Sequence, residues 1–439
     1  MKTLSYIFCL AVSQILQASD PGQWPKWRGP DDNGMARGEA PRRWSDTENI
    51  NWKAAIPGRG HSSPVLWGDQ IFLTTAIPTD PAKVLASGRS TEARPRGRRG
   101  NPGAQPEHRF DVLCLDRKTG KLLWQRTATT AEPHEGYHHM YGSLASNSPV
   151  TDGKRLYAFF GSRGIYCYDL EGKLIWKKDF GLMKMRLGYG EGTAPALGGD
   201  VLILGFDQET GSFIVALDKN TGRELWRASR DETSNWAMPL VLDYKGSLQV
   251  VAGGTKKVIG YDLKTGKVIW ECAGLGRNVI PALVRQDDVV FAMSGNQNPN
   301  LMAIRLGRTG DLTGTDSVLW TNARGNSYTP SPVLHDNKLY VLADNGLLSC
   351  YNARTGAPYY HMARLPRPYS FKSSLVGANG KLYLTSEDDD VVVVKMGEKF
   401  EVLATNSLKD QFFVATPAIA DGEIFLRGQN TLFSISEKR

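Results

Sequence analysis

The sequence has little cysteine, and its cysteines stand apart from one another. It carries 5 in 439 residues, with no adjacent pair and no Cys-x-x-Cys-His motif. Covalent attachment of a c-type haem needs that motif, so this route for electron transfer is excluded. The cysteines of the mature chain are Cys114, Cys167, Cys272 and Cys350. Because three of them occupy equivalent places in separate repeats, we expect buried free thiols rather than disulfides.

Long apolar runs are also lacking. The one candidate follows Lys2, extends from Leu4 to Leu16 and ends near the small residue Ala18. This pattern predicts a signal peptide over 1–18 and an exported chain, periplasmic or secreted. No later stretch is long and apolar enough to cross a bilayer, so we expect no transmembrane segment.

Apolar periodicity of helical length is scarce, whereas short β-branched and aromatic runs between Gly and Asp turns are common. The chain has 46 Gly, 11 Trp and 16 Tyr. This balance predicts an all-β fold. The formal charge of +8 is concentrated in an Arg-, Gly- and Pro-rich insert at 78–108. We interpret that insert as disordered, and we expect no specific nucleic-acid partner.

Two sequence elements alternate along the chain. The first is a small residue, a Pro and an apolar pair, followed by a turn and an apolar strand. It occurs at Pro64, Pro149, Pro195, Pro239, Pro281, Pro332 and Pro417, and without its proline at Ser373-Ser374-Leu375. The second is an Asp-x-x-Thr-Gly turn followed by a strand with Trp. The Trp residues assigned to this outer position are Trp52, Trp124, Trp176, Trp226, Trp270 and Trp320.

The spacing of these elements predicts the architecture. Successive prolines from Pro149 to Pro332 are 42 to 51 residues apart. A period of this size, made of four short strands, is typical of a β-propeller. Eight starts predict eight four-stranded antiparallel blades over 49–439. Pro suits a first strand because one edge of that strand faces the central channel.

The two ends of the chain predict how the ring closes. The last repeat, from Ala415 to Ser436, supplies only about three strands, and 49–56 has an outer-strand pattern with nothing before it. We expect these segments to complete one blade by pairing. Residues 19–48 then form an N-terminal extension that packs on the propeller.

With these residues in view, the chain resembles the PQQ-like repeat propellers. The resemblance is carried by 24–30 (Trp-Pro-Lys-Trp-Arg-Gly-Pro), 148–153, 167–176, 310–313 and 400–406. That group contains quinoprotein dehydrogenases and the outer-membrane assembly propeller, so the resemblance implies an envelope protein. In the dehydrogenases, PQQ lies at the channel with calcium, an Asp base and often a disulfide between adjacent cysteines. Since no two cysteines are adjacent here, we expect no cofactor, and PQQ with calcium is the alternative.

Polar side chains predict a functional surface at one end of the channel. The connections before each first strand and after each second strand gather there. The candidates are His61, His138, Glu191, Asp207, Trp236, Asn278, Asn296, Tyr328, Asp344 and Glu387. They either bind a ligand or merely solvate the channel. The charge run Glu387-Asp388-Asp389-Asp390 is interpreted as a solvated hairpin tip.

A histidine-rich connection precedes blade two. His134 and His138 could share a metal if the segment were helical. Pro133 and Gly136 favour a loop instead, and a hydrogen-bonded surface loop is the alternative to a metal site. No catalytic arrangement stands out.

These observations favour a non-catalytic, monomeric exported propeller that binds an envelope protein, peptide or glycan. Two alternatives remain open. One is a quinoprotein-like oxidoreductase that uses the channel mouth, and the other is an assembly factor for envelope proteins.

Overall fold

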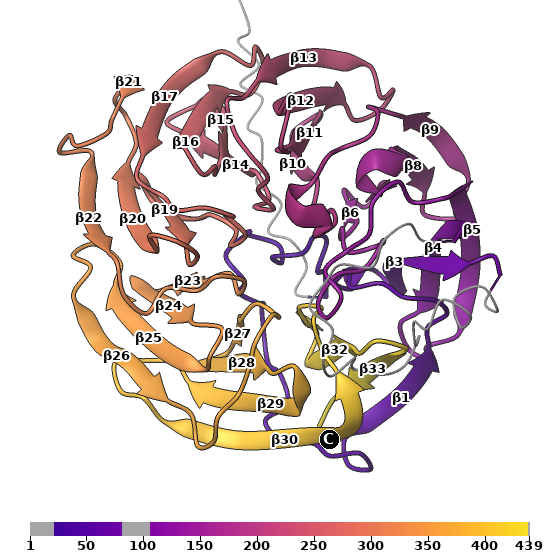
Figure 1. Cartoon of the computed structure of the whole chain (residues 1–439). Coiled ribbons are helices and arrows are strands. Elements are labelled where there is room, and N and C mark those ends of the chain that lie inside the picture. Colours follow the sequence, from indigo (N-terminus) through magenta and orange to yellow (C-terminus); the bar gives the residue numbers. More distant parts are fainter. Residues whose placement is uncertain (1–21, 81–105, 438–439) are drawn as a thin grey trace, which may run out of the picture.

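The computed structural model describes residues 22–80 and 106–437, which form a ring of eight antiparallel blades around a central channel (Figure 1). The predicted all-β propeller is therefore confirmed. The predicted signal peptide (1–18) and most of the basic insert at 78–108 lie outside the described residues. Within the described part, no helix has the length and apolar character needed to span a membrane.

Each blade begins at the channel and ends at the rim. Blade one contains β2 (Val65–Trp67), β3 (Gln70–Pro78), β4 (His108–Asp116) and β5 (Leu122–Ala131). Blade two contains β6 (Val150–Thr151), β7 (Arg155–Phe159), β8 (Ile165–Asp169) and β9 (Leu174–Lys178). Blade three contains β10 (Ala196–Gly198), β11 (Val201–Phe206), β12 (Phe213–Asp218) and β13 (Glu224–Ser229). Blade four contains β14 (Leu240–Tyr244), β15 (Ser247–Ala252), β16 (Lys257–Asp262) and β17 (Val268–Ala273).

The second half of the ring repeats this order. Blade five contains β18 (Val284–Gln286), β19 (Val289–Ser294), β20 (Asn300–Arg305) and β22 (Val318–Asn322). Blade six contains β23 (Val333–His335), β24 (Lys338–Leu342), β25 (Leu347–Asn352) and β26 (Pro358–Arg364). Blade seven contains β27 (Val376–Ala378), β28 (Lys381–Thr385), β29 (Asp388–Lys395) and β30 (Val402–Phe412). Two short 3-10 helices, η1 (Gly161–Arg163) and η2 (Arg186–Gly188), lie in connections.

Blade eight closes the ring with both ends of the chain. It contains β31 (Ala418–Ala420), β32 (Glu423–Arg427), β33 (Thr431–Ile435) and, outermost, β1 (Ile50–Ala55). β1 pairs antiparallel with β33, with Lys53 opposite Phe433. The predicted closure is confirmed.

The outer tryptophans join neighbouring blades, as their position predicts. The indole N–H of Trp176 donates to the Lys219 carbonyl of blade three at 3.0 Å, and its ring packs against Gly222. The same bond, to the residue after the turn Asp or Asn, occurs at Trp52, Trp124, Trp226 and Trp320. Each indole thus buries a large apolar ring and satisfies its one donor across a seam.

Blade four departs from the predicted pattern of four strands. A fifth strand, β21 (Gly310–Asp311), pairs parallel with the outer edge of β17. Blade five has no short Thr-Gly turn, because the longer connection between β20 and β22 supplies β21. Trp270 therefore donates within its own blade, to Gln249 Oε1 at 3.1 Å.

A belt of hydroxyl groups links the first strands of six successive blades, five through eight and then one and two. The residue before the Pro accepts a hydrogen bond from the preceding blade. Ser331 N donates to Ser374 Oγ, Ser374 N to Thr416 Oγ1, Thr416 N to Ser63 Oγ, and Ser63 N to Ser148 Oγ. Ala282 N begins the series at Ser331 Oγ. In blades three and four the equivalent residues are Ala194 and Met238, which have no hydroxyl.

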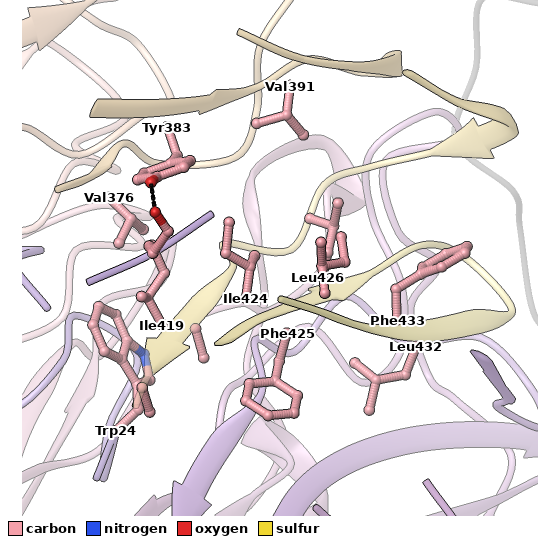
Figure 2. Packing of buried hydrophobic residues seen from close by; sticks show 14 of the residues in the cluster. Trp24, Val376, Tyr383, Val391, Ile419, Ile424, Phe425, Leu426, Leu432 and Phe433 are labelled. Atoms are coloured by element: carbon pink, nitrogen blue, oxygen red, sulfur yellow. Dashed lines mark hydrogen bonds between the residues drawn. The ribbon is translucent and has the colours of Figure 1, made fainter. Parts of the chain in front are cut away.

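The N-terminal extension fills one end of the channel. Trp24, fully buried, forms a β-bridge with Leu66 of blade one, and Gly34 accepts a bond from Gly377 of blade seven. Figure 1 shows this indigo segment crossing the centre of the ring. Figure 2 shows Trp24 among apolar side chains of blades seven and eight, including Val376 and Ile419.

Candidate functional site

The end of the channel opposite the extension collects the connections that precede the first strands and follow the second strands. We call this end the mouth. The extension contacts the first strands within their length, at Leu66 and Gly377. It also reaches the residues just before these strands, because Trp27 Nε1 donates to Thr416 Oγ1 and Arg28 donates to the Pro332 and Leu375 carbonyls.

Lys372 is the charged centre of the mouth. Its Nζ lies 3.0 Å from Asp344 Oδ1 and 3.7 Å from Glu387 Oε1, and its side chain is only 11 % exposed. The same ammonium lies 4.6 Å from the centre of the Tyr141 ring. Lys372, in the connection before blade seven, thus forms ion pairs with carboxylates of blades six and seven. Its cation–π contact reaches Tyr141, in the connection before blade two.

Aromatic side chains extend this centre across the mouth. The ring of His138 stacks on Tyr141 at 5.0 Å and on His139 at 4.9 Å, and it meets Tyr189 at 5.4 Å. On the other side, Asn278 Nδ2 donates to the Tyr328 hydroxyl at 3.2 Å, and Tyr328 N donates to Asp344 Oδ2 at 2.7 Å.

The electrostatics of the mouth hold Lys372 charged and His138 neutral. Burial opposes the charge on Lys372, but Asp344 and Glu387 outweigh it, and its pKa is raised. Burial lowers the pKa of His138 to about 4, with further repulsion from His139 and Lys372. At neutral pH the mouth therefore presents the Lys372 ammonium together with an uncharged His138 ring.

The structure brings five of the predicted residues into this cluster: His138, Asn278, Tyr328, Asp344 and Glu387. The other predicted residues have different surroundings. Asp207 is held by Arg230 at 2.7 Å, a buried ion pair within blade three. The half-buried Glu191 accepts two bonds from Ser162, and desolvation raises its pKa.

The remaining three candidates also have structural partners. His61 Nδ1 lies 2.8 Å from the Tyr141 carbonyl oxygen, beneath the mouth. Trp236 Nε1 donates to the Gly190 carbonyl at 2.8 Å, and Asn296 forms an isolated β-bridge with Arg277. Trp236 and Asn296 therefore shape connections rather than join the Lys372 cluster.

The histidine-rich connection is a hydrogen-bonded loop. His134 Nε2 lies 2.6 Å from the Met183 carbonyl oxygen, and His134 Nδ1 lies 3.2 Å from Arg163 Nη2, whereas His138 stacks in the mouth. The two histidines thus have separate surroundings. Within residues 22–80 and 106–437, no group of three His, Cys, Asp or Glu side chains is placed to hold a metal ion.

The prediction that the charge run forms a solvated hairpin tip is wrong for two of its four residues. Glu387 is buried, with Ser370 Oγ donating to it at 2.7 Å. Asp390 is buried and accepts bonds from Arg367, Tyr369 and Ser407. Asp388 is exposed and Asp389 is half-buried, whereas Glu387 and Asp390, at the two ends of the run, face the blade interior. There, hydroxyl and basic partners offset the desolvation of these carboxylates.

Lys372 was missed at the level of sequence, although a signal for it was present. His61, Trp236 and Asn278 each stand three residues before the proline of a repeat start. Lys372 stands three residues before Leu375, which takes the place of the proline in the start at Ser373-Ser374-Leu375. That start is recognisable in the sequence, so Lys372 could have been included among the candidates.

The eight blades, the Trp–turn contacts and the channel mouth define a PQQ-like repeat β-propeller. The family model described as outer membrane protein assembly factor BamB matches residues 108–362 and 308–398. The chain therefore belongs to this family. No curated protein matches the sequence.

Solved structures share the fold at low sequence identity. BamB from Moraxella catarrhalis is 13% identical with a TM-score of 0.56, over 89% of this chain and 98% of that one. The quinohemoprotein alcohol dehydrogenase from Comamonas testosteroni is 10% identical with a TM-score of 0.63, over 95% and 81%. A europium-containing methanol dehydrogenase is 13% identical with a TM-score of 0.60, over 94% and 91%. At these identities the likeness extends to the fold alone.

The residues of the mouth do not fit PQQ with calcium. A calcium ion needs several oxygen ligands, and Asp344 and Glu387 are the carboxylates of the cluster. Both are already turned toward Lys372, whose ammonium lies where a cation would have to bind. The four described cysteines are buried, free and distributed over four blades.

Proposed function

We propose that this protein is a non-catalytic binding scaffold of the bacterial envelope, and that it engages a partner protein, peptide or glycan through the mouth. The observation that carries the proposal is that five separate connections meet around Lys372, Tyr141 and His138. They are the connections before blades two, three and seven and those after the second strands of blades six and seven. Loops held by a rigid ring are a common way to present a binding surface. The ring needs no second copy to close, so the proposed scaffold acts as a monomer.

Membership in a family described by an outer-membrane assembly factor supports an envelope location. The signal-peptide pattern over 1–18 points the same way, toward the periplasm or secretion. The alternative role is that of an assembly factor, whose bound partner would be an envelope protein undergoing assembly. The charged and aromatic side chains of the mouth would suit a peptide segment of such a partner as well as a glycan.

Site-specific photo-crosslinking in the envelope tests the mouth. A photoreactive residue replaces either the half-buried mouth residue His139 or Lys245, in the turn between β14 and β15 at the other end of the blades. We expect a discrete adduct from position 139 that disappears when Lys372→Met is added, and none from position 245. Equal adducts from both positions, or an adduct that survives Lys372→Met, would contradict the proposal.

Titration of the purified mature protein with PQQ in the presence of calcium separates the scaffold from a quinoprotein. We expect no one-to-one binding by calorimetry and no change in visible absorbance of the quinone. Tight stoichiometric binding would replace the scaffold with the oxidoreductase alternative.

A further inference from the structure

Arg28 and Arg427 are the two arginines that are less than 2 % exposed among the described residues, and burial lowers the pKa of each to about 9. They differ in their hydrogen bonds, because Arg28 leaves only Nε without a partner whereas Arg427 leaves both Nε and Nη2 without one. Arg28 of the extension donates from Nη1 to the Leu375 carbonyl at 3.0 Å and from Nη2 to the Pro332 carbonyl at 2.7 Å. Its charge also has Asp32 nearby. Arg28 is thus a structural clamp between blades six and seven.

Arg427, the last residue of β32, forms hydrogen bonds from only one of its three guanidinium nitrogens. Its Nη1 donates to the Ser62 carbonyl at 2.9 Å and to Ser62 Oγ at 2.5 Å. Its Nε and Nη2 are buried and have no hydrogen-bond partner among the described residues. An unpaired buried charge is among the most costly features that a protein interior can hold.

The two unpaired groups lie on one edge of the guanidinium. Nε–H and Nη2–H point in parallel, which is the geometry that receives the two oxygens of a carboxylate. Gly60 packs against this edge, and a Cβ there would lie 2.6 Å from Arg427 Nη2 and 2.6 Å from the Thr74 carbonyl oxygen, so no side chain fits at position 60.

The neighbourhood of Arg427 carries an excess of positive charge. Arg59 Nε is also buried without a partner, whereas the unpartnered His61 Nε2 is an uncharged acceptor because Nδ1 faces the Tyr141 carbonyl oxygen. Burial lowers the pKa of His61 to about 3, and Arg59 and Arg427 repel its proton further. Burial alone lowers the pKa of Arg427 to about 9, and no acid acts on it. The group that is missing from this site is therefore an anion.

We propose that the Nε–Nη2 edge of Arg427 binds a carboxylate group beside Arg59 and His61, where β32 and the entry to blade one meet under the mouth. The carboxylate belongs either to a small organic acid or to the C-terminus of a polypeptide. This site goes beyond the proposed scaffold function, since it is tested on the isolated protein without any partner.

Thermal unfolding of the mature protein at constant ionic strength tests the site. Sodium acetate is the probe, and sodium chloride, whose anion has no oxygen atoms to accept two parallel hydrogen bonds, is the reference. We expect acetate to raise the unfolding midpoint saturably by about 2 °C, and chloride to leave it unchanged. Equal midpoints in acetate and chloride would overturn the proposal.

Variants connect the response to Arg427. Arg427→Lys keeps a positive charge but loses the paired N–H edge, so we expect it to abolish the acetate response. Arg28→Lys is the matched buried control, which lowers the midpoint in both salts and retains the acetate response. If Arg427→Lys does not fold, Arg59→Gln replaces it and should weaken the apparent acetate affinity at least threefold. An acetate response that survives these changes would place the anion elsewhere.

Triglycine and its C-terminal amide distinguish the two sources. Saturation by triglycine at a lower concentration than acetate, with no effect of the amide, assigns the site to a polypeptide terminus. A response to acetate but not to triglycine assigns it to a small organic acid.

Discussion

At the scale of single residues, stability depends on glycines that admit a neighbour's indole ring. Gly222 has a φ of +72°, and a Cβ there would lie 2.6 Å from Trp176. Gly211 has the same φ of +72° but open space around it. Substitution by alanine at both positions introduces the same backbone strain, but only at Gly222 does the new methyl group also clash with the Trp176 ring. Comparing the two variants therefore separates the two effects.

We predict that Gly222→Ala lowers the free energy of unfolding by about 2–4 kcal/mol, of which strain at positive φ contributes about 1 kcal/mol. Gly211→Ala should cost only the strain, about 1 kcal/mol. Urea denaturation of both variants measures the difference. Equal losses would mean that the Trp176 ring moves aside freely.

His61 gives the protein a defined sensitivity to acid. Its pKa is lowered from 6.5 to about 3 in the folded chain, so the unfolded chain binds a proton first as the pH falls. The stabilisation is complete above pH 6.5 and is lost progressively toward pH 3, by about 1.4 kcal/mol per pH unit.

We therefore predict that His61→Gln unfolds with a shallower pH dependence than the wild type between pH 6 and 4. Glutamine can still donate to the Tyr141 carbonyl. Urea titrations at three pH values measure the slope, and His335→Gln, at an exposed position, is the control. An unchanged slope for His61→Gln would show that His61 is protonated in the folded protein.

At the scale of elements, β1 closes the ring. Its register with β33 buries Trp52 against Phe425, at 6.1 Å between ring centres. We predict that replacing 49–56 by glycine and serine lowers the unfolding midpoint by more than about 10 °C. Adding a synthetic peptide of sequence 49–56 should restore part of the loss, and a scrambled peptide should not. A midpoint within about 2 °C of the wild type would mean that the ring closes without β1.

The elements also show what the sequence could predict. The eight starts and the outer Trp positions were predictable because each depends on a local requirement, a missing Pro N–H or a turn of positive φ. The strand β21 could not be predicted, because it has only two residues and such a short strand leaves no periodic pattern in the sequence. The pairing of Glu387 was hidden for a similar reason, because its partners Ser370 and Lys372 come from the preceding connection.

At the scale of the whole molecule, each blade is packed between two others and no blade buries both faces alone. The four cysteines, Cys114, Cys167, Cys272 and Cys350, lie in blades one, two, four and six. Burial raises the thiol pKa to about 12 in three of them and to about 11 in Cys272. Each of these thiols becomes accessible to a reagent only when its own blade unfolds, so together they report on unfolding in four different blades.

We predict that all four thiols are unreactive toward a thiol reagent in the native protein and become reactive together at the global unfolding transition. Mass spectrometry of the labelled protein across a urea series measures the number modified. Molecules with one or two labels at intermediate urea would show that blades open separately.

The composition of blade eight also fixes the order in which the protein is completed. β1 is made long before its partner β33, with which it pairs from Ile50–Ile435 to Ala55–Thr431. Pairing between segments so distant in the sequence seals the ring, and long-range pairing of this kind forms slowly. Until β33 is made, the chain is an open arc with two unfinished edges, and the time spent in that state sets its exposure to proteases and to aggregation.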